Sequence, residues 1–245
     1  MDISEDRILD GRVRLRQGLG GYRAGLDAAL LAAACEAADG ERVIEPGCGA
    51  GAVLLAAAAR GPGARFMGVE RDGDALELAR ANIELNGLGA RVEARGGDIG
   101  EAFSRLGLRL FDAALANPPF FDDPASLRGP GGAKRGTWIA DEGLAGWTAF
   151  LINAVREGGA ITMIHRADRL ADILALLGPK CGAFQVRPVH PFADAPAKRI
   201  LVRAVKSAKA PLRLLPALVI HPRDGAKHTD EAEAILRGEA AAPWL

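Results

Sequence analysis

Short apolar runs alternate with longer helical patterns through most of this chain, and this alternation constrains the fold more than any other feature. Runs typical of buried strands occur at residues 42–45, 65–70, 91–95, 111–116 and 160–165. The segments between them are long enough for the helical crossovers that parallel strands require. Strands that are apolar throughout are buried on both faces. The sequence therefore predicts an α/β fold in which helices cover both faces of a mostly parallel sheet.

The segments that flank this core predict small additions to it. Residues 184–189 and 199–205 have the pattern of a final strand pair, which brings the expected sheet to seven strands. Before the core, an alternating segment at 8–16 predicts a hairpin with a basic side, followed by a glycine-rich loop at 18–25 and a helix at 26–38. After the core, an apolar run at 212–220 precedes a short amphipathic helix at 230–236. We expect one domain over 1–245, with an N-terminal extension (1–40), a core (41–206) and a C-terminal extension (207–245).

The charge balance limits the kinds of partner that this chain attracts. It has 31 basic and 31 acidic residues, so its net charge gives no overall attraction to nucleic acid. One local bias exists, because residues 187–213 contain several Lys and Arg side chains and Asp194 as their single acid. This segment is either a solvated rim or a surface that faces RNA.

Cysteine and histidine usage argues against a metal or a disulfide framework. Cys35, Cys48 and Cys181 form no C-x-x-C pair, and the four histidines have no partners at ligand spacing. The first residues are acidic, unlike a signal peptide. The Ala-rich run at 26–38 contains Asp27 and is too short to cross a bilayer. We therefore expect a cytoplasmic protein that binds neither a metal nor a membrane.

A glycine loop follows the first core strand, where open α/β sheets bind their ligands. It has the sequence Glu45-Pro-Gly-Cys-Gly-Ala-Gly51. Gly47, Gly49 and Gly51 let the backbone turn sharply and approach a ligand closely. Acidic residues end the next two strands, and Glu70 is placed to accept hydrogen bonds from ribose hydroxyls, as Asp98 is from an adenine amine. These residue types predict a nucleoside-containing cofactor.

The loop alone fits two cofactors. Residues 47–52 satisfy the dinucleotide fingerprint G-x-G-x-x-G/A, and Glu70 lies at about the expected distance for a nicotinamide cofactor. Three features favour a sulfonium cofactor instead. Glu45 suits a cationic amino group better than a pyrophosphate, Asp98 suits an adenine amine, and the motif at 117–120 has no use in hydride transfer.

That motif, Asn117-Pro-Pro-Phe120, follows the apolar strand at 111–116. The two prolines lack N–H donors, so their carbonyls point outward without local partners. Asn117 adds a side-chain carbonyl, and Phe120 adds a flat apolar face. Two acceptors beside a ring form a slot for a planar group that carries an NH2. This pattern predicts methylation of the exocyclic amine of a base or of an amide.

Together these motifs resemble the class I S-adenosylmethionine-dependent methyltransferases, which have a Rossmann-like fold. Within that class the chain resembles the bacterial tRNA(Val) (adenine-N6)-methyltransferase family. The resemblance covers most of the chain and is carried by residues 17–23, Asp27, 43–51, 68–70, 97–98, 117–120, 218–221 and 228–237. One departure is Phe120, where that family more often has tyrosine. Similar Asn-Pro-Pro-aromatic motifs occur in methyltransferases for guanine N2 of ribosomal RNA and for release-factor glutamine.

The residues and the resemblance together assign a role to each candidate site residue. For catalysis, the candidates are Asn117, Pro118 and Phe120. For binding S-adenosylmethionine, they are Glu45, Gly47, Gly49, Gly51, Glu70, Asp98, Asn117, Tyr22 and Asp27. For binding substrate, they are Pro119, Phe120, Arg23, Lys134 and Arg135.

The leading hypothesis is an S-adenosylmethionine-dependent transferase that modifies adenine N6 in tRNA. The same chemistry on guanine N2 of ribosomal RNA or on a protein glutamine is the first alternative. A nicotinamide-dependent oxidoreductase and a non-catalytic RNA-binding module are the alternatives from other functional classes.

Overall fold

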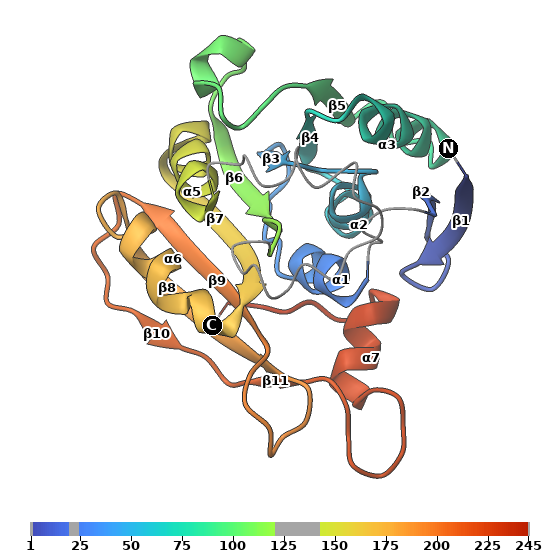
Figure 1. The fold of residues 1–245 in the computed structure, drawn as a ribbon, viewed down its shortest axis with the longest axis vertical. Coiled ribbons are helices and arrows are strands. Elements are labelled where there is room, and N and C mark those ends of the chain that lie inside the picture. The colour runs from blue at the N-terminus through green and yellow to red at the C-terminus, as the bar shows by residue number, and fades with distance from the viewer. Residues whose placement is uncertain (1, 20–24, 121–142, 245) are drawn as a thin grey trace, which may run out of the picture.

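The computed structural model describes residues 2–19, 25–120 and 143–244, and these form an α/β fold around one large twisted sheet (Figure 1). The strands are β1 (Ile3–Ile8), β2 (Val13–Gly18), β3 (Arg42–Pro46), β4 (Arg65–Glu70), β5 (Val92–Gly96), β6 (Phe111–Ala116), β7 (Val155–Arg166), β8 (Cys181–His190), β9 (Arg199–Lys206), β10 (Arg213–Leu214) and β11 (Leu218–Val219). The helices are α1 (Leu26–Ala33), α2 (Ala52–Arg60), α3 (Gly73–Leu85), α5 (Gly143–Ala154), α6 (Leu170–Leu177) and α7 (Asp230–Arg237), with short 3-10 turns at Phe103–Leu106 and Ala167–Arg169.

The order of strands in the main sheet determines where a ligand is expected to bind. The order is β10-β8-β9-β7-β6-β3-β4-β5, and β11 also pairs with β8. Strands β5, β4, β3, β6 and β7 pair in parallel with one another, and β9 is antiparallel to both β7 and β8. The chain proceeds from β3 outward to β4 and β5, and then returns to place β6 on the other side of β3. This reversal is a topological switch point, and ligands of open α/β sheets bind there, beyond the carboxyl ends of the strands.

The expected mostly parallel sheet is confirmed, and its far edge is wider than the seven strands of the prediction. The two-residue strands β10 and β11 both pair with β8, which makes the main sheet nine-stranded within the described residues. Segments this short give no readable alternation in the sequence. The division into residues 1–40, 41–206 and 207–245 stays a prediction.

Helices cover both faces of the sheet, and each face has its own apolar core. Helices α1, α2 and α3 pack on one face, and α5 and α6 pack on the other, as Figure 1 shows. Helix α2 is deeply buried, because every residue from Ala52 to Ala58 is inaccessible to solvent or nearly so. It is enclosed because α1, β4 and the β1–β2 hairpin all contact it.

Local sequence signals set the bounds of α3. The Asp72 side chain caps the helix by accepting a hydrogen bond from the Ala75 backbone N–H at 2.9 Å. At its other end Gly87 has a left-handed φ of 66°, which favours glycine. The helix predicted between Asp72 and Asn86 is therefore confirmed.

Three other boundaries differ from the prediction for reasons that lie outside the local sequence. Helix α1 ends at Ala33, because the carbonyls of Ala33 and Ala34 accept hydrogen bonds from the C-terminal residues Ala242 and Trp244. Strand β7 begins at Val155, and Gly158-Gly159 lies in an irregular part of that strand instead of ending a helix. Strand β8 begins at Cys181, three residues before the expected start.

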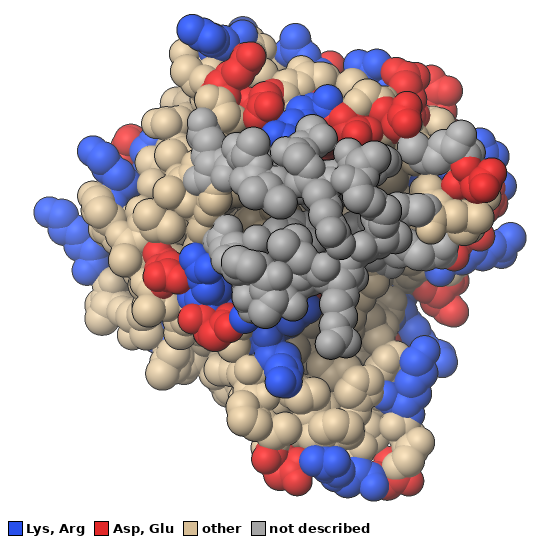
Figure 2. All heavy atoms as spheres, viewed as in Figure 1, with Lys and Arg blue, Asp and Glu red and all other residues tan. Residues whose placement is uncertain are grey.

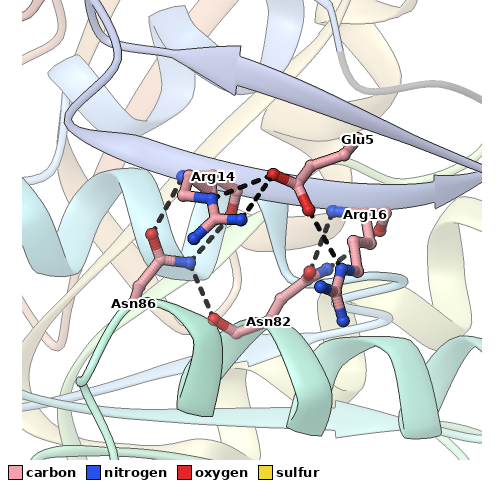
Figure 3. Close-up of polar contacts among 5 residues, drawn as sticks. All are labelled: Glu5, Arg14, Arg16, Asn82 and Asn86. Carbon is pink, nitrogen blue, oxygen red and sulfur yellow. Dashed lines mark hydrogen bonds and ion pairs between the residues drawn. The ribbon is translucent and has the colours of Figure 1, made fainter.

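Two asparagines join the N-terminal hairpin to α3 (Figure 3). Their side-chain amides hydrogen-bond to the backbone of β2 in the way that an adjacent strand would. Asn82 accepts a hydrogen bond from the Arg16 N–H at 2.8 Å and donates to the Arg16 carbonyl at 2.9 Å. Asn86 makes the same pair of bonds with Arg14. Asn82 also donates to the Ala50 carbonyl at 2.9 Å, so it connects the hairpin with the glycine loop. On the hairpin's outer side the Arg14 and Arg16 guanidiniums both pair with Glu5.

We expect Asn82→Ala to lower the free energy of unfolding by about 3 kcal/mol, because Asn82 is fully buried and loses three hydrogen bonds of roughly 1 kcal/mol each. Urea unfolding of the cofactor-free protein measures this change. The matched variant Asn86→Ala removes analogous bonds from a partly exposed side chain and should cost less. Equal losses for the two variants would contradict a special role for Asn82.

None of the described helices combines the length and the apolar character needed to cross a membrane.

Candidate cofactor and acceptor site

The two motifs singled out in the sequence face each other across the switch point. The glycine loop follows β3, and Asn117 follows β6, the strand that pairs directly with β3. The motifs are more than sixty residues apart in the chain. They meet because parallel strands present their carboxyl ends at the same edge of a sheet.

The glycine loop has a backbone that only glycine adopts without strain. Gly47, Gly49 and Gly51 have φ values of 61°, 54° and 87°, all in the left-handed region. Gly47 also lies against the ring of Trp147, since an added Cβ would be 2.3 Å from the Trp147 Cη2 atom. Around Gly49 the corresponding space is open. The loop is therefore held against α5 at one glycine and leaves room beside the next.

Glu70 fixes this loop to the end of β4. One oxygen of its carboxylate accepts a hydrogen bond from the Gly49 N–H at 2.8 Å. The other oxygen accepts from the N–H groups of Arg71 and Asp72, each at 2.9 Å. The carboxylate is buried and oriented by these three bonds, and the oxygen that accepts only from Gly49 retains acceptor capacity for a hydroxyl.

Glu45 is a buried carboxyl that pairs with no cation in the described part of the chain. Its residue is 3% exposed, and its Oε2 atom has no hydrogen-bond partner among the described residues. Burial raises the pKa of Glu45 well above its ordinary value, and the Glu70 carboxylate raises it further, whereas a hydrogen bond from the Leu54 backbone N–H lowers it. A buried acid in this state is stabilised by an incoming cationic group. The amino group of a methionine moiety is such a group, so this site fits the sulfonium cofactor.

Asp98 lies at the outer end of the same row of strand ends. Its side chain is partly exposed, pairs with Arg71 at 3.7 Å and accepts a hydrogen bond from the Gly100 N–H at 2.9 Å. These contacts orient the carboxylate without burying it. Its expected contact with an adenine amine stays a prediction.

The motif Asn117-Pro-Pro-Phe120, called the acceptor motif below, contains one aromatic ring. This ring, Phe120, is the acceptor platform, and two other side chains contact it. The Phe120 ring contacts the His165 ring edge-on, with ring centroids 5.1 Å apart. The Arg199 guanidinium lies over the same Phe120 ring, 4.6 Å from its centroid. Arg199 in turn donates a hydrogen bond to Asp27 at 3.0 Å. Asp27, predicted to lie near the cofactor, is thus a buried partner of the arginine that packs on the acceptor motif.

Two contributors to this site lie beyond what sequence reasoning found. Arg199 belongs to the basic segment at 187–213, where the sequence gives no single side chain a role, and Trp147 lies outside the motifs. Asp27 and Arg199 are far apart in the chain, and no spacing rule connects them. His165 lies near the carboxyl end of β7, and its contact with Phe120 puts it beside the acceptor motif.

Four predicted site residues, Tyr22, Arg23, Lys134 and Arg135, lie outside the described residues. Within the described ranges, no cluster of three or more His, Cys, Asp or Glu side chains is arranged to hold a metal ion.

Comparison with known proteins supports a methyltransferase relationship. Residues 37–140 match a family model described as a methyltransferase domain. A tRNA1(Val) (adenine(37)-N6)-methyltransferase from Porphyromonas gingivalis is 30% identical over 215 residues, which cover 83% of each chain. The chain belongs to this family of S-adenosylmethionine-dependent methyltransferases. A release factor glutamine methyltransferase from Chlorobaculum tepidum is 27% identical over 165 residues, covering 64% of this chain and 56% of that protein.

A solved structure supports the same methyltransferase fold over nearly the whole chain. The crystal structure of a predicted O-methyltransferase from Agrobacterium tumefaciens superposes with a TM-score of 0.74 at 27% identity, covering 89% of this chain and 99% of that one. The matches to the C. tepidum enzyme and to two further curated relatives cover only 56%, 60% and 61% of those proteins. The superposition on the A. tumefaciens structure confirms the Rossmann-like class I methyltransferase fold.

Proposed function

We propose that this protein transfers a methyl group from S-adenosylmethionine to the exocyclic amine of a nucleobase, adenine N6 in a tRNA. The observation that supports this most is the position of Asn-Pro-Pro-Phe directly across the switch point from the glycine loop. A methyl donor held by the loop would then lie beside two carbonyl acceptors and a ring.

Three carboxylates would hold the cofactor. Glu45 would pair with its methionine amino group, Glu70 with its ribose hydroxyls and Asp98 with its adenine amine. When bound, the cofactor supplies an electrophilic methyl group on a sulfonium. Of the three, Glu45 gives the clearest prediction, because its carboxylate is buried with one oxygen unpartnered among the described residues.

The acceptor motif would orient the amine. A base turned out of its stack would lie on Phe120, where stacking contributes roughly 1–3 kcal/mol. The Asn117 Oδ1 atom and the Pro118 carbonyl would accept the two NH2 hydrogens, and Pro119 would border the same slot. These bonds turn the nitrogen lone pair away from the ring and toward the methyl group. Since the methylated ammonium is strongly acidic, no side-chain base is needed.

The alternatives use the same slot. Guanine N2 and a glutamine amide are also planar amines, and a release factor glutamine methyltransferase is among the relatives. The P. gingivalis tRNA enzyme aligns with more of this chain, 83% against 64%, which favours tRNA adenine as the acceptor.

We expect Glu45→Gln to weaken S-adenosylmethionine binding and to change how stability depends on pH. Because the folded pKa of Glu45 is raised, stability from this carboxyl is present at low pH and is lost as pH rises toward that pKa. Each unit of pKa difference corresponds to about 1.4 kcal/mol. The free energy of unfolding of the cofactor-free protein, measured at about pH 5 and at about pH 8, tests this. These two pH values lie on either side of the ordinary histidine pKa. The wild type should lose more stability over this interval than Glu45→Gln.

The two readouts for Glu45 check each other. Calorimetric titration with S-adenosylmethionine should show weaker binding by Glu45→Gln, while its melting temperature at high pH equals or exceeds that of the wild type. A variant that is less stable at high pH but binds the cofactor normally would show that Glu45 is structural only.

Methyl transfer from labelled S-adenosylmethionine to unmodified total tRNA, followed by nucleoside analysis, tests the proposed function. We expect labelled N6-methyladenosine. Label in ribosomal RNA or in protein, or in a nucleoside methylated on oxygen, would reject the acceptor and keep the cofactor site. No transfer to any of these substrates would reject catalysis and favour an RNA-binding module.

A further inference from the structure

A second depression lies beside the acceptor motif and is separate from the glycine loop. It is a cavity of about 280 Å³ at the carboxyl end of β8. Strand β8 runs in the same direction as β7, because both are antiparallel to β9. The cavity therefore opens at the sheet edge where β6 and β7 end, which is the edge that carries Asn117 and Phe120.

The cavity has an apolar floor. Val189 at the end of β8 and Ile220 just after β11 are both buried, and Leu26 and Pro191 add half-buried apolar surface. The floor is fixed by backbone bonds, since the N–H of Ile220 donates to the His190 carbonyl at 2.9 Å and the N–H of Lys198 donates to the Val189 carbonyl at 3.0 Å. A surface of this kind suits a flat apolar group such as a base.

Two cations border this floor. Arg199 lines the cavity and also lies over Phe120, so one guanidinium connects the cavity with the acceptor platform. Asp27 pairs with Arg199 and offsets its charge. Lys198 lines the cavity too, and its side chain is exposed with no acidic partner among the described residues. Figure 2 shows Lys and Arg side chains gathered just below the grey segments on this face.

Aromatic rings continue from the cavity toward its outer rim. His221 lines the cavity and stacks on His228, with centroids 5.6 Å apart and planes 24° apart. The Phe192 ring lies 5.6 Å from His221, and the Arg223 guanidinium lies 3.9 Å from the Phe192 centroid. Interleaved rings and cations are the usual means of holding single-stranded nucleic acid.

We propose that this cavity binds the nucleotide next to the target base in an RNA substrate. The base of that nucleotide lies on the apolar floor against His221, and the phosphate that joins it to the target nucleotide lies near Lys198 and Arg199. Arg199 spans the two positions, so the target base on Phe120 and its neighbour are held in a fixed relation. This inference rests on the proposed function, because it takes the substrate to be RNA.

Binding of a fluorescently labelled unmodified tRNA, measured by anisotropy over a range of salt concentrations, tests the subsite. Losing one phosphate contact reduces the slope of log affinity against log salt by about 0.7–0.9. We expect this reduction for Lys198→Gln. The matched control is Lys209→Gln, an exposed lysine beyond the opposite end of β8, which should leave the slope unchanged.

His221→Ala tests the stacking part of the proposal. It should weaken binding by roughly 5-fold or more with the salt slope unchanged. Full affinity and an unchanged slope in both cavity variants would overturn the subsite. A wild type that binds no RNA would overturn both the subsite and the proposed function.

Methylation assays on the same RNA separate the two proposals. Binding that depends on Lys198 and His221, without any methyl incorporation, would keep the subsite and reject the proposed function. Methylation of tRNA that neither variant impairs, in binding or in rate, would keep the function and reject the subsite.

Discussion

Replacing Asn117 with alanine is expected to reduce the rate of methyl transfer by at least about 100-fold while S-adenosylmethionine still binds. Losing one oriented polar group at a reaction centre typically costs about 100- to 1000-fold in rate. The side chain follows β6 and is only partly buried, so its removal leaves the sheet and its core intact. Without its carbonyl the amine keeps one acceptor, and its lone pair is no longer directed at the methyl group.

Single-turnover methyl transfer and calorimetric titration with S-adenosylmethionine measure the two halves of this prediction separately. The matched control is Asn153→Ala, which makes the same change at an exposed position on α5 and should leave both values unchanged. Asn117→Gln should also be slow, because the added methylene displaces the carbonyl. Wild-type turnover in Asn117→Ala would remove Asn117 from the mechanism.

The parts of the fold that follow from the sequence are those set by local pattern. The core strands and α3 could be predicted because apolar runs, the Asp72 cap and the glycine at 87 act over a few residues. Helix α1 could not be bounded in this way, since its last carbonyls are satisfied by Ala242 and Trp244 from the other end of the chain. Strands β10 and β11 are defined by their pairing with β8, so no local pattern of their own predicts them.

The same distinction applies to the candidate site. The glycines, Glu45, Glu70 and Asn117 could be named as candidates because each lies at or just after the carboxyl end of a strand, in a recognisable motif. Arg199 could not be predicted, because its position over Phe120 depends on the antiparallel return of β9 beside β7. Contacts made by the fold and not by a motif, such as that of Arg199 with Phe120, therefore lie beyond what local sequence patterns predict.

The glycine loop and α5 are coupled through Gly47 and Trp147. Trp147 is buried beneath the loop, and its ring occupies the space that any side chain at position 47 would need. We infer that the conformation of the loop, and with it the position of the Gly49 N–H that donates to Glu70, depends on this contact. A change at Gly47 should therefore affect both folding and cofactor binding.

We expect Gly47→Ala to be the most destabilising single substitution in the loop. A non-glycine residue in the left-handed region costs about 1–2 kcal/mol, and overpacking against the indole adds about 1–3 kcal/mol. Gly87→Ala is the matched control, because its φ of 66° is similar to the 61° of Gly47 and its added Cβ meets nothing within 4 Å. Urea unfolding should show the smaller loss for Gly87→Ala, and calorimetric titration should show impaired S-adenosylmethionine binding only for Gly47→Ala.

A double-mutant cycle isolates the contact with the indole. Trp147→Leu removes the ring that the new methyl group meets, so Gly47→Ala should cost less in that background than in the wild type. The remaining cost should approach that of Gly87→Ala, since the left-handed φ is then the main penalty. Strict additivity of the two substitutions would show that Trp147 does not set the conformation of the loop, and the loss in Gly47→Ala would then come from its backbone alone.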